Sequence, residues 1–94
     1  MDMKYRSRSE IASYILEAAN GGATKTRIMY KAFLSYAQLK EYLSMLEANG
    51  LLRYERETQR MITTSKGLKF LQLNNQMDQL AYGEREQEIE TRVG

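Results

Sequence analysis

The sequence of 94 residues contains no cysteine and no histidine. Without cysteine the chain has no disulfide, no thiolate nucleophile and no thiolate metal ligand. Without histidine it lacks the commonest general base and the commonest zinc ligand, so any catalysis would depend on carboxylates alone. We therefore expect no enzymatic activity, no catalytic residues, no metal and no cofactor.

Long hydrophobic runs are also missing. No apolar run approaches the roughly 18 residues that a membrane span needs, and residues 1–8 lack the hydrophobic stretch of a signal peptide. We expect a soluble, intracellular protein with no membrane partner, and no pattern indicates a small-molecule ligand. The 43% hydrophobic content of this short chain is enough for one compact domain.

The small net charge of +2 conceals an uneven distribution. Residues 1–69 hold 12 Lys and Arg against 7 Asp and Glu, whereas residues 70–94 hold 2 against 5. A basic globular part followed by an acidic tail suits an anionic partner that contacts one end of the molecule. The alternative interpretation is a merely solubilising surface.

Two capped helices are predicted in the first third of the chain. Ser7 and Glu10 form a capping box that predicts a helix from about Arg8 to Ala19, ended by residues 20–22, Asn-Gly-Gly. Thr24 then caps a short second helix. The apolar contacts of this second helix are expected from Ile28, Met29 and Ala32.

A third helix has the strongest start signal. Ser35 and Gln38 form a second capping box, and Leu34 and Leu39 occupy the positions of a hydrophobic staple. The helix should begin at Tyr36 and end at residues 49–50, Asn-Gly. Its predicted buried stripe is Tyr36, Leu39, Leu43 and Leu46. Only residues 33–35 separate it from the second helix, which indicates a helix-turn-helix.

Beyond Gly50 the pattern changes from helical to extended. Residues 51–55 and 60–63 are rich in aliphatic, aromatic and β-branched side chains, and they predict a short hairpin with residues 56–59 as its loop. Ser65 is the predicted N-cap of a last helix that starts near Lys66.

The last helix carries more apolar side chains than a small core needs. Leu68 and Leu71 are expected to pack on the domain. Four others repeat at the three-and-four spacing of a coiled coil and predict a homodimer contact: Phe70, Leu73, Met77 and Leu80. The alternative is that this stripe packs on the first helix of its own chain.

The expected fold is mainly α with a small β-hairpin. The order α-α-α-β-β-α, with a short link before the third helix and an extended last helix, is the arrangement of a winged helix-turn-helix. We assign residues 1–65 to a winged-helix DNA-binding domain and residues 66–83 to a C-terminal helix for dimerisation. Residues 84–94 form an acidic tail.

This order of elements predicts binding of double-stranded DNA. The third helix would enter the major groove, where Gln38, Lys40 and Ala37 suit adenine, guanine and thymine edges respectively. Gln38 has a competing role in the capping box. The DNA-contact residues expected on the helices are Lys25, Arg27, Lys31, Ser35, Ala37, Gln38, Lys40 and Ser44.

The hairpin would be the wing, lying on the DNA backbone. Arg53, Arg56 and Arg60 are its expected phosphate contacts, unless Glu55 and Glu57 neutralise them. Lys4, Arg6 and Arg8 are expected to act as a basic N-terminal arm. A positive charge at Arg8 is unfavourable beside the positive end of the helix dipole, and this placement favours a role in binding phosphate.

The segments TKTRIMYKAFLSYAQLKEYLSMLEANGLL and ITTSKGLKFL carry a family resemblance. Over roughly residues 7–80 the chain resembles archaeal winged-helix DNA-binding domains, which include the dimeric ten-kilodalton chromatin-type proteins. The resemblance implies an intracellular archaeal DNA binder that dimerises through an antiparallel coiled coil of the last helix. Phe33 departs from the small polar residue, often Asn, expected at its position, and Gly83 interrupts the last helix.

Three functions remain open at this point. The first is a sequence-selective transcription regulator in the cytoplasm, and the second is an architectural, nucleoid-associated DNA binder. The third is a protein-interaction module on the same frame. Modest basicity favours the regulator, whereas the acidic side chains Glu41, Glu55 and Glu57 favour the interaction module.

Overall fold

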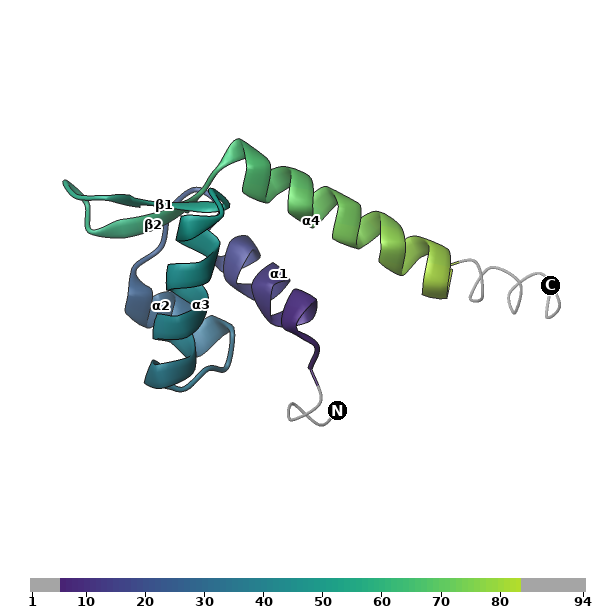
Figure 1. Cartoon of the computed structure of the whole chain (residues 1–94), viewed down its shortest axis with the longest axis horizontal. Helices are drawn as coiled ribbons and strands as arrows, with labels where there is room; N and C mark the ends of the chain where they lie inside the picture. Colours follow the sequence, from purple (N-terminus) through teal and green to yellow (C-terminus); the bar gives the residue numbers. More distant parts are fainter. Residues whose placement is uncertain (1–5, 84–94) are drawn as a thin grey trace, which may run out of the picture.

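Three helices, a hairpin and a long final helix follow one another in the computed structural model, which describes residues 6–83 (Figure 1). The elements are α1 (Arg8–Ala18), α2 (Lys25–Lys31), α3 (Tyr36–Ala48), β1 (Leu52–Glu55), β2 (Arg60–Thr63), α4 (Ser65–Asp78) and η2 (Gln79–Gly83). The expected mainly helical fold with one antiparallel hairpin is confirmed. Within the described residues, no helix has the length and apolar character to cross a membrane.

Both predicted capping boxes form. The Ser7 hydroxyl accepts from the Glu10 amide at 3.1 Å, and the Ser7 amide donates to the Glu10 carboxylate. At α3, the Gln38 amide donates to the Ser35 hydroxyl at 3.2 Å, and the Ser35 amide donates to Gln38 Oε1 at 3.0 Å. These local contacts satisfy the amides that a helix start leaves without partners.

The cap of α4 differs from the prediction by one residue. Thr64, not Ser65, is the N-cap, and Ser65 is the first helical residue. The Thr64 hydroxyl accepts from the Gly67 amide at 3.1 Å and donates to the Gly50 carbonyl at 2.6 Å. Thr64 therefore caps α4 and joins its start to the turn after α3, a long-range contact that cap preferences do not reveal.

The core lies between α1, α2, α3, the hairpin and the start of α4. Its fully buried large side chains are Ile15, Leu16, Ile28, Leu46, Leu52 and Met61. The stripe predicted on α3 is correct for Leu39, Leu43 and Leu46 but wrong for Tyr36, which is 71% exposed. Side chains tilt toward the start of their helix, so Tyr36, the first residue of α3, projects beyond the N-terminal end of the helix. Tyr42, which the stripe omitted, is buried instead.

The hairpin is attached to the helices by polar contacts as well as by burial. Strand β2 pairs with β1 in the register Leu52↔Thr63 and also pairs with Ala23, in the link between α1 and α2, through two backbone hydrogen bonds. The Thr63 hydroxyl donates to the Leu16 carbonyl at 2.7 Å in a buried position. The base of the wing is thereby held in place against α1.

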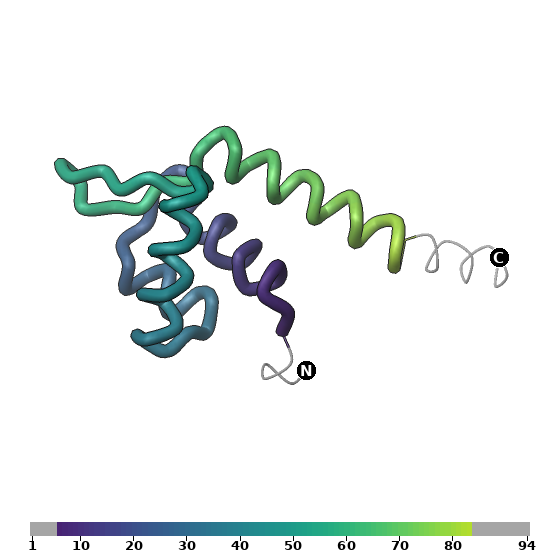
Figure 2. Tube along the Cα trace, viewed as in Figure 1, coloured from purple at the N-terminus to yellow at the C-terminus, as the bar shows by residue number. Residues whose placement is uncertain are grey.

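Helix α4 belongs to the domain at one end only. Gly67 and Leu71 are buried and Phe70 is half-buried against the core, whereas Leu68, expected to pack inward, is 44% exposed. A Cβ at Gly67 would collide with the Leu51 carbonyl and with Thr63 Cγ2, so α4 approaches the hairpin at a point where only glycine fits. The later turns of α4 extend past α1 (Figures 1 and 2).

Candidate nucleic-acid interface

All eleven residues predicted to contact DNA are exposed. They lie on α2, on α3 with its N-cap, and on the hairpin, which together make up the side of the domain away from α4 (Figure 1). Exposure leaves each of these side chains accessible to a partner. None of them is used to build the core.

The outer face of α3 combines small and cationic side chains. Ala37, Lys40 and Ser44 lie opposite the buried arc of Leu39, Tyr42 and Leu46. Lys40 and Ser44 also line a shallow cavity of about 220 Å³ with Lys25 from α2. The structure therefore brings the first residue of α2 next to the middle of α3, although the two are distant in sequence.

Gln38 is committed to its cap. Its Oε1 atom accepts from the Ser35 amide, so the acceptor of the side-chain amide is engaged while its NH2 group still has donor capacity. A paired contact with an adenine edge needs both the donor and the acceptor. With the cap in place, Gln38 is therefore limited to donating hydrogen bonds.

The cations of α2 and α3 have no ionic partner among the described residues. Arg27 and Lys31 are four positions apart on α2, and neither they nor Lys40 lies within ion-pair distance of Glu41. Within residues 6–83, Glu41 therefore does not neutralise this face. Its positive charge is available to an anion.

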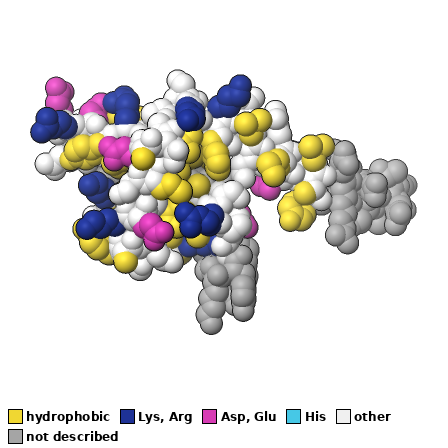
Figure 3. Space-filling view, viewed as in Figure 1, with side chains coloured by type: hydrophobic (Ala, Val, Ile, Leu, Met, Phe, Trp, Pro, Cys, Tyr) yellow, Lys and Arg dark blue, Asp and Glu magenta, His cyan; other side chains and the backbone are white. Residues whose placement is uncertain are grey.

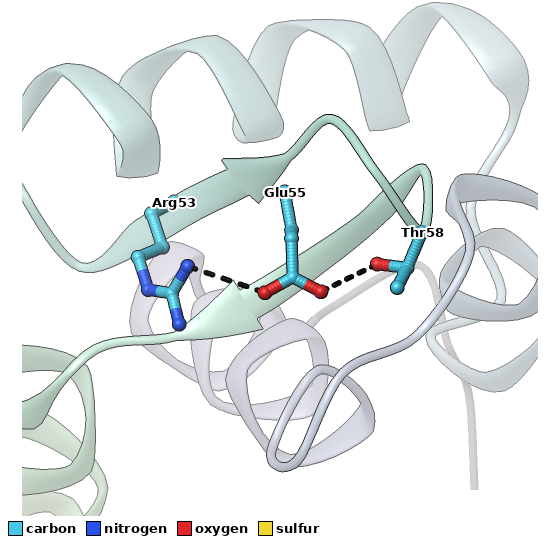
Figure 4. A network of polar contacts seen from close by, with 3 residues as sticks. All are labelled: Arg53, Glu55 and Thr58. Atoms are coloured by element: carbon cyan, nitrogen blue, oxygen red, sulfur yellow. Dashed lines mark hydrogen bonds and ion pairs between the residues drawn. The ribbon is translucent and has the colours of Figure 1, made fainter.

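The hairpin is only partly neutralised. Arg53 approaches Glu55 at 3.7 Å, and the Thr58 hydroxyl donates to the same carboxylate at 2.7 Å (Figure 4). Arg56 and Arg60 form no ion pair within residues 6–83. The alternative of a neutralised wing therefore applies to Arg53 and not to the other two arginines.

A cation–π contact links α2 to the wing. The Lys25 ammonium lies 5.2 Å from the centroid of the Tyr54 ring on β1. Such a contact orients a lysine without neutralising its charge. Sequence reasoning proposed Lys25 as a DNA contact but did not pair it with Tyr54, because nothing local joins these residues.

The described part of the basic N-terminal arm contacts the domain, which corrects the expectation for Arg6, whereas Arg8 is exposed and its DNA contact stays a prediction. The Arg6 guanidinium donates to the carbonyls of Ala32 at 2.6 Å and Phe33 at 3.0 Å. Arg8 lies over the Tyr42 ring, 5.4 Å from its centroid. The carbonyls at the end of α2 accept hydrogen bonds from the partly buried guanidinium, so Arg6 closes the turn. Lys4 lies outside the described residues.

Three large aromatic side chains surround this turn. Tyr30, Phe33 and Tyr36 are 70%, 66% and 71% exposed. Phe33 also has a φ of 55°, a left-handed conformation that suits the Asn expected there better than it suits phenylalanine. Sequence reasoning noticed the unusual Phe33 but missed the group, because it placed Tyr36 in the core.

Comparisons with known proteins agree on the fold. A crystal structure of Sso10a-2, described as a DNA-binding protein from Sulfolobus solfataricus, is similar with a TM-score of 0.75. The two share 22% sequence identity, over 94% of this chain and 95% of that one. A sequence search of curated proteins found no match. The winged helix-turn-helix profile matches residues 5–82, so this chain belongs to the winged helix-turn-helix family.

Proposed function

We propose that this protein binds double-stranded DNA as a transcription regulator and has no enzymatic activity. Helix α3 enters the major groove and the β1–β2 hairpin lies on the backbone. The observation that carries this proposal is the unneutralised positive charge of Arg27, Lys31 and Lys40 around an exposed helix of groove-sized diameter. A role on DNA would place the protein in the cytoplasm, at the nucleoid.

Phosphate contacts would supply most of the affinity. Arg27 and Lys31 of α2 flank the groove-binding helix, while Arg56 and Arg60 extend the same positive charge along the wing. Binding of this kind releases counterions and weakens as salt rises. Such contacts fix the position of the protein on DNA without reading its sequence.

Base contacts would come from α3. Ala37 leaves room for a thymine methyl group, Lys40 reaches a guanine edge or a phosphate, and the free NH2 of Gln38 donates to an acceptor. Ser44 adds a short hydroxyl side chain to the same face, and the exposed Ser35 hydroxyl lies at the start of α3. A mixed polar surface of this type favours selective sites over uniform coating.

The test is binding of the purified protein to random-sequence and genomic duplex DNA across a salt series, followed by footprinting. Salt-sensitive binding with discrete protected sites supports a regulator. Uniform coverage would make the protein architectural, and absence of binding even at low salt would contradict DNA binding and favour a protein-interaction module.

Three alanine variants test the proposed face. Arg27→Ala and Lys40→Ala should weaken binding without loss of folding, and Arg56→Ala should weaken it nearly equally on all sequences. Each variant should lower the slope of the logarithm of the binding constant against the logarithm of the salt concentration by about 1. Lys69→Ala, on exposed α4, is the matched control that should change nothing. Unchanged affinity in all three variants at low salt would show that the face is wrong.

We further propose that α4 and the following η2 pair two copies of the chain. Leu73, Met77 and Leu80 are 50%, 67% and 68% exposed, so within the described residues they are not covered by α1. This supports the dimer over the alternative of intrachain packing. Phe70, the fourth residue of the stripe, is half-buried against its own core and would contribute less.

This proposal also assigns roles to the parts of the chain. Residues 1–65 form the DNA-binding domain together with the buried start of α4, and the exposed remainder of residues 66–83 forms the dimer contact. The acidic tail of residues 84–94 lies outside the described residues. Sedimentation of Met77→Glu/Leu80→Glu should show monomers, and a dimer of unchanged stability would place the contact elsewhere.

A further inference from the structure

The exposed aromatic group at the α2–α3 turn is not explained by the fold. Tyr30, Phe33 and Tyr36 each leave about two thirds or more of their surface in water, whereas Tyr42 on the same helix pair is buried. Figure 3 shows hydrophobic side chains next to Lys and Arg side chains over the end of the domain where α2 and α3 meet. Large apolar groups gathered on a surface commonly mark a binding site.

Phe33 is unfavourable on two independent grounds. Its backbone adopts a left-handed conformation, with φ of 55°, that bulky residues rarely occupy, and its ring is 66% exposed. Asparagine or glycine would adopt this turn with less strain, so neither backbone geometry nor core packing accounts for the phenylalanine. Strained residues that the rest of a structure holds in place occur preferentially at functional sites.

The turn that carries Phe33 is held rigidly. Arg6 donates to the carbonyls of Ala32 and Phe33, and the Leu34 amide donates to the Met29 carbonyl at 3.0 Å. The Arg6 guanidinium itself lies 5.4 Å from the centroid of the Tyr14 ring. A turn whose backbone is held in this way loses little conformational freedom on binding, which favours affinity.

The aromatic group borders the proposed DNA face through Tyr36, the first residue of α3. Tyr36 lines the same cavity as Lys25 and Lys40, and Lys31 follows Tyr30 directly on α2. Residues at the start of a groove-binding helix contact base edges. The apolar feature of those edges is the C5-methyl group of thymine, which phenylalanine and other apolar side chains contact.

From this placement we infer that Phe33, together with Tyr36, is a contact site for thymine methyl groups, so that the protein prefers sites with thymine near the start of α3. The inference rests on the proposed DNA binding and adds a specificity-determining residue to it. The flanking cations fit a DNA partner better than an apolar protein surface, which would have to desolvate them.

Replacing thymine by uracil tests the site, because it removes the methyl group and keeps the base pairing. Affinities should be measured for alternating d(A-T) and d(A-U) duplexes of equal length. The wild-type protein should bind the d(A-U) duplex about threefold to fivefold more weakly for each methyl group contacted. Phe33→Asn should fold at least as well and should reduce that difference by about threefold to fivefold, the share of one methyl contact.

The control variant is Arg27→Ala, which removes a proposed phosphate contact and should weaken binding to both duplexes while keeping the ratio of their affinities. Phe33→Gly provides a second variant that the left-handed turn accepts. Equal wild-type affinity for both duplexes would overturn the methyl site while leaving DNA binding intact.

Two other results would also overturn the assignment. A thymine preference of unchanged size in Phe33→Asn would assign methyl reading to another side chain, with Ala37 the first to examine. Tighter binding of single-stranded d(T) than of the duplex, lost in Phe33→Asn, would show that the aromatic group stacks on unpaired bases. Binding to neither duplex at low salt would instead refute the proposed function itself.

Discussion

The helix-turn-helix body and the last helical turns of the chain have the same spacing of apolar residues, but these residues are buried in the body and exposed in the last turns. In the body, Ile28 and Leu46 are 0% and 1% exposed, whereas Met77 on α4 and Leu80 on η2 are 67% and 68% exposed. Spacing therefore tells which side chains share a helix face but not what covers that face. The body covers its stripes with its own elements, and α4 presents its stripe to a partner in our proposal.

The two regions also differ in polar contacts. In the body, side chains distant in sequence close the turns, as Arg6 does at the end of α2 and Thr63 does at the end of α1. Within the described residues, no side-chain hydrogen bond involves the part of α4 beyond Gly67. Substitutions should consequently be costly in the body and tolerated in the far half of α4.

The largest contrast should come from truncating one apolar residue in each region. Ile28→Ala should lower the free energy of unfolding by about 2–5 kcal/mol, because it leaves a cavity in a fully buried site. Leu80→Ala should change it by less than about 0.5 kcal/mol at protein concentrations where the chain is monomeric. Urea unfolding at two protein concentrations measures the free energy of unfolding of both variants. Equal losses of stability at the lower protein concentration would contradict the difference between the two regions.

Two glycines of the last helical segment should respond in opposite directions. Gly67→Ala should destabilise by about 1–3 kcal/mol, since the added Cβ meets the Leu51 backbone and Thr63. A Cβ added at Gly83 would lie 2.8 Å from Oε1 at the movable end of the Gln79 side chain. Gly83→Ala should therefore be neutral or stabilise the protein by up to about 1 kcal/mol. Thermal unfolding of both variants measures the direction of each change in stability. An unchanged stability of Gly67→Ala would mean that α4 does not approach the hairpin so closely.

A smaller effect is expected from removing one buried hydroxyl. Thr63→Val keeps the shape of the side chain but deletes the donor to the Leu16 carbonyl, at an expected cost of about 1–2 kcal/mol. Thr58→Val, which deletes an exposed hydrogen bond to Glu55, is the matched control and should change stability by less than about 0.5 kcal/mol. Similar values for the two variants would indicate that the hairpin is not anchored through Thr63.

The smallest expected difference concerns the start of α4. Thr64→Ala should cost about 1 kcal/mol through loss of the cap, whereas Ser65→Ala should be nearly neutral because Ser65 is already helical. Chemical unfolding of both variants compares them directly. A larger loss of stability in Ser65→Ala than in Thr64→Ala would indicate that Ser65 is the N-cap, as residue preferences alone suggested.

Elements with local signals were predictable from the sequence. Two capping boxes, the Thr24 cap and the hairpin strands lie where their residues indicated, because each signal acts within a few positions along the chain. The exposure of the candidate DNA contacts was predictable for a related reason, since charged and small polar residues lie on helix faces that the apolar stripe excludes.

Contacts between distant residues were not predictable. Nothing near Arg6 in the sequence indicates the carbonyls of Ala32 and Phe33 as its partners, and nothing near Ala23 indicates pairing with Met61. The exchange of Tyr36 for Tyr42 in the core has the same origin. Both lie near the edge of one helical arc, and the surrounding elements decide which of them is covered.

For this protein, the sequence alone determined the order of elements, the starts of its first three helices and the cationic character of one side, because caps, turns and charges act locally. The tertiary structure decided which apolar faces are buried, that Arg6 closes the α2–α3 turn, and that an aromatic group with Phe33 at its centre remains in solvent. The physical reason is that burial depends on which segments meet, and only the folded chain brings them together.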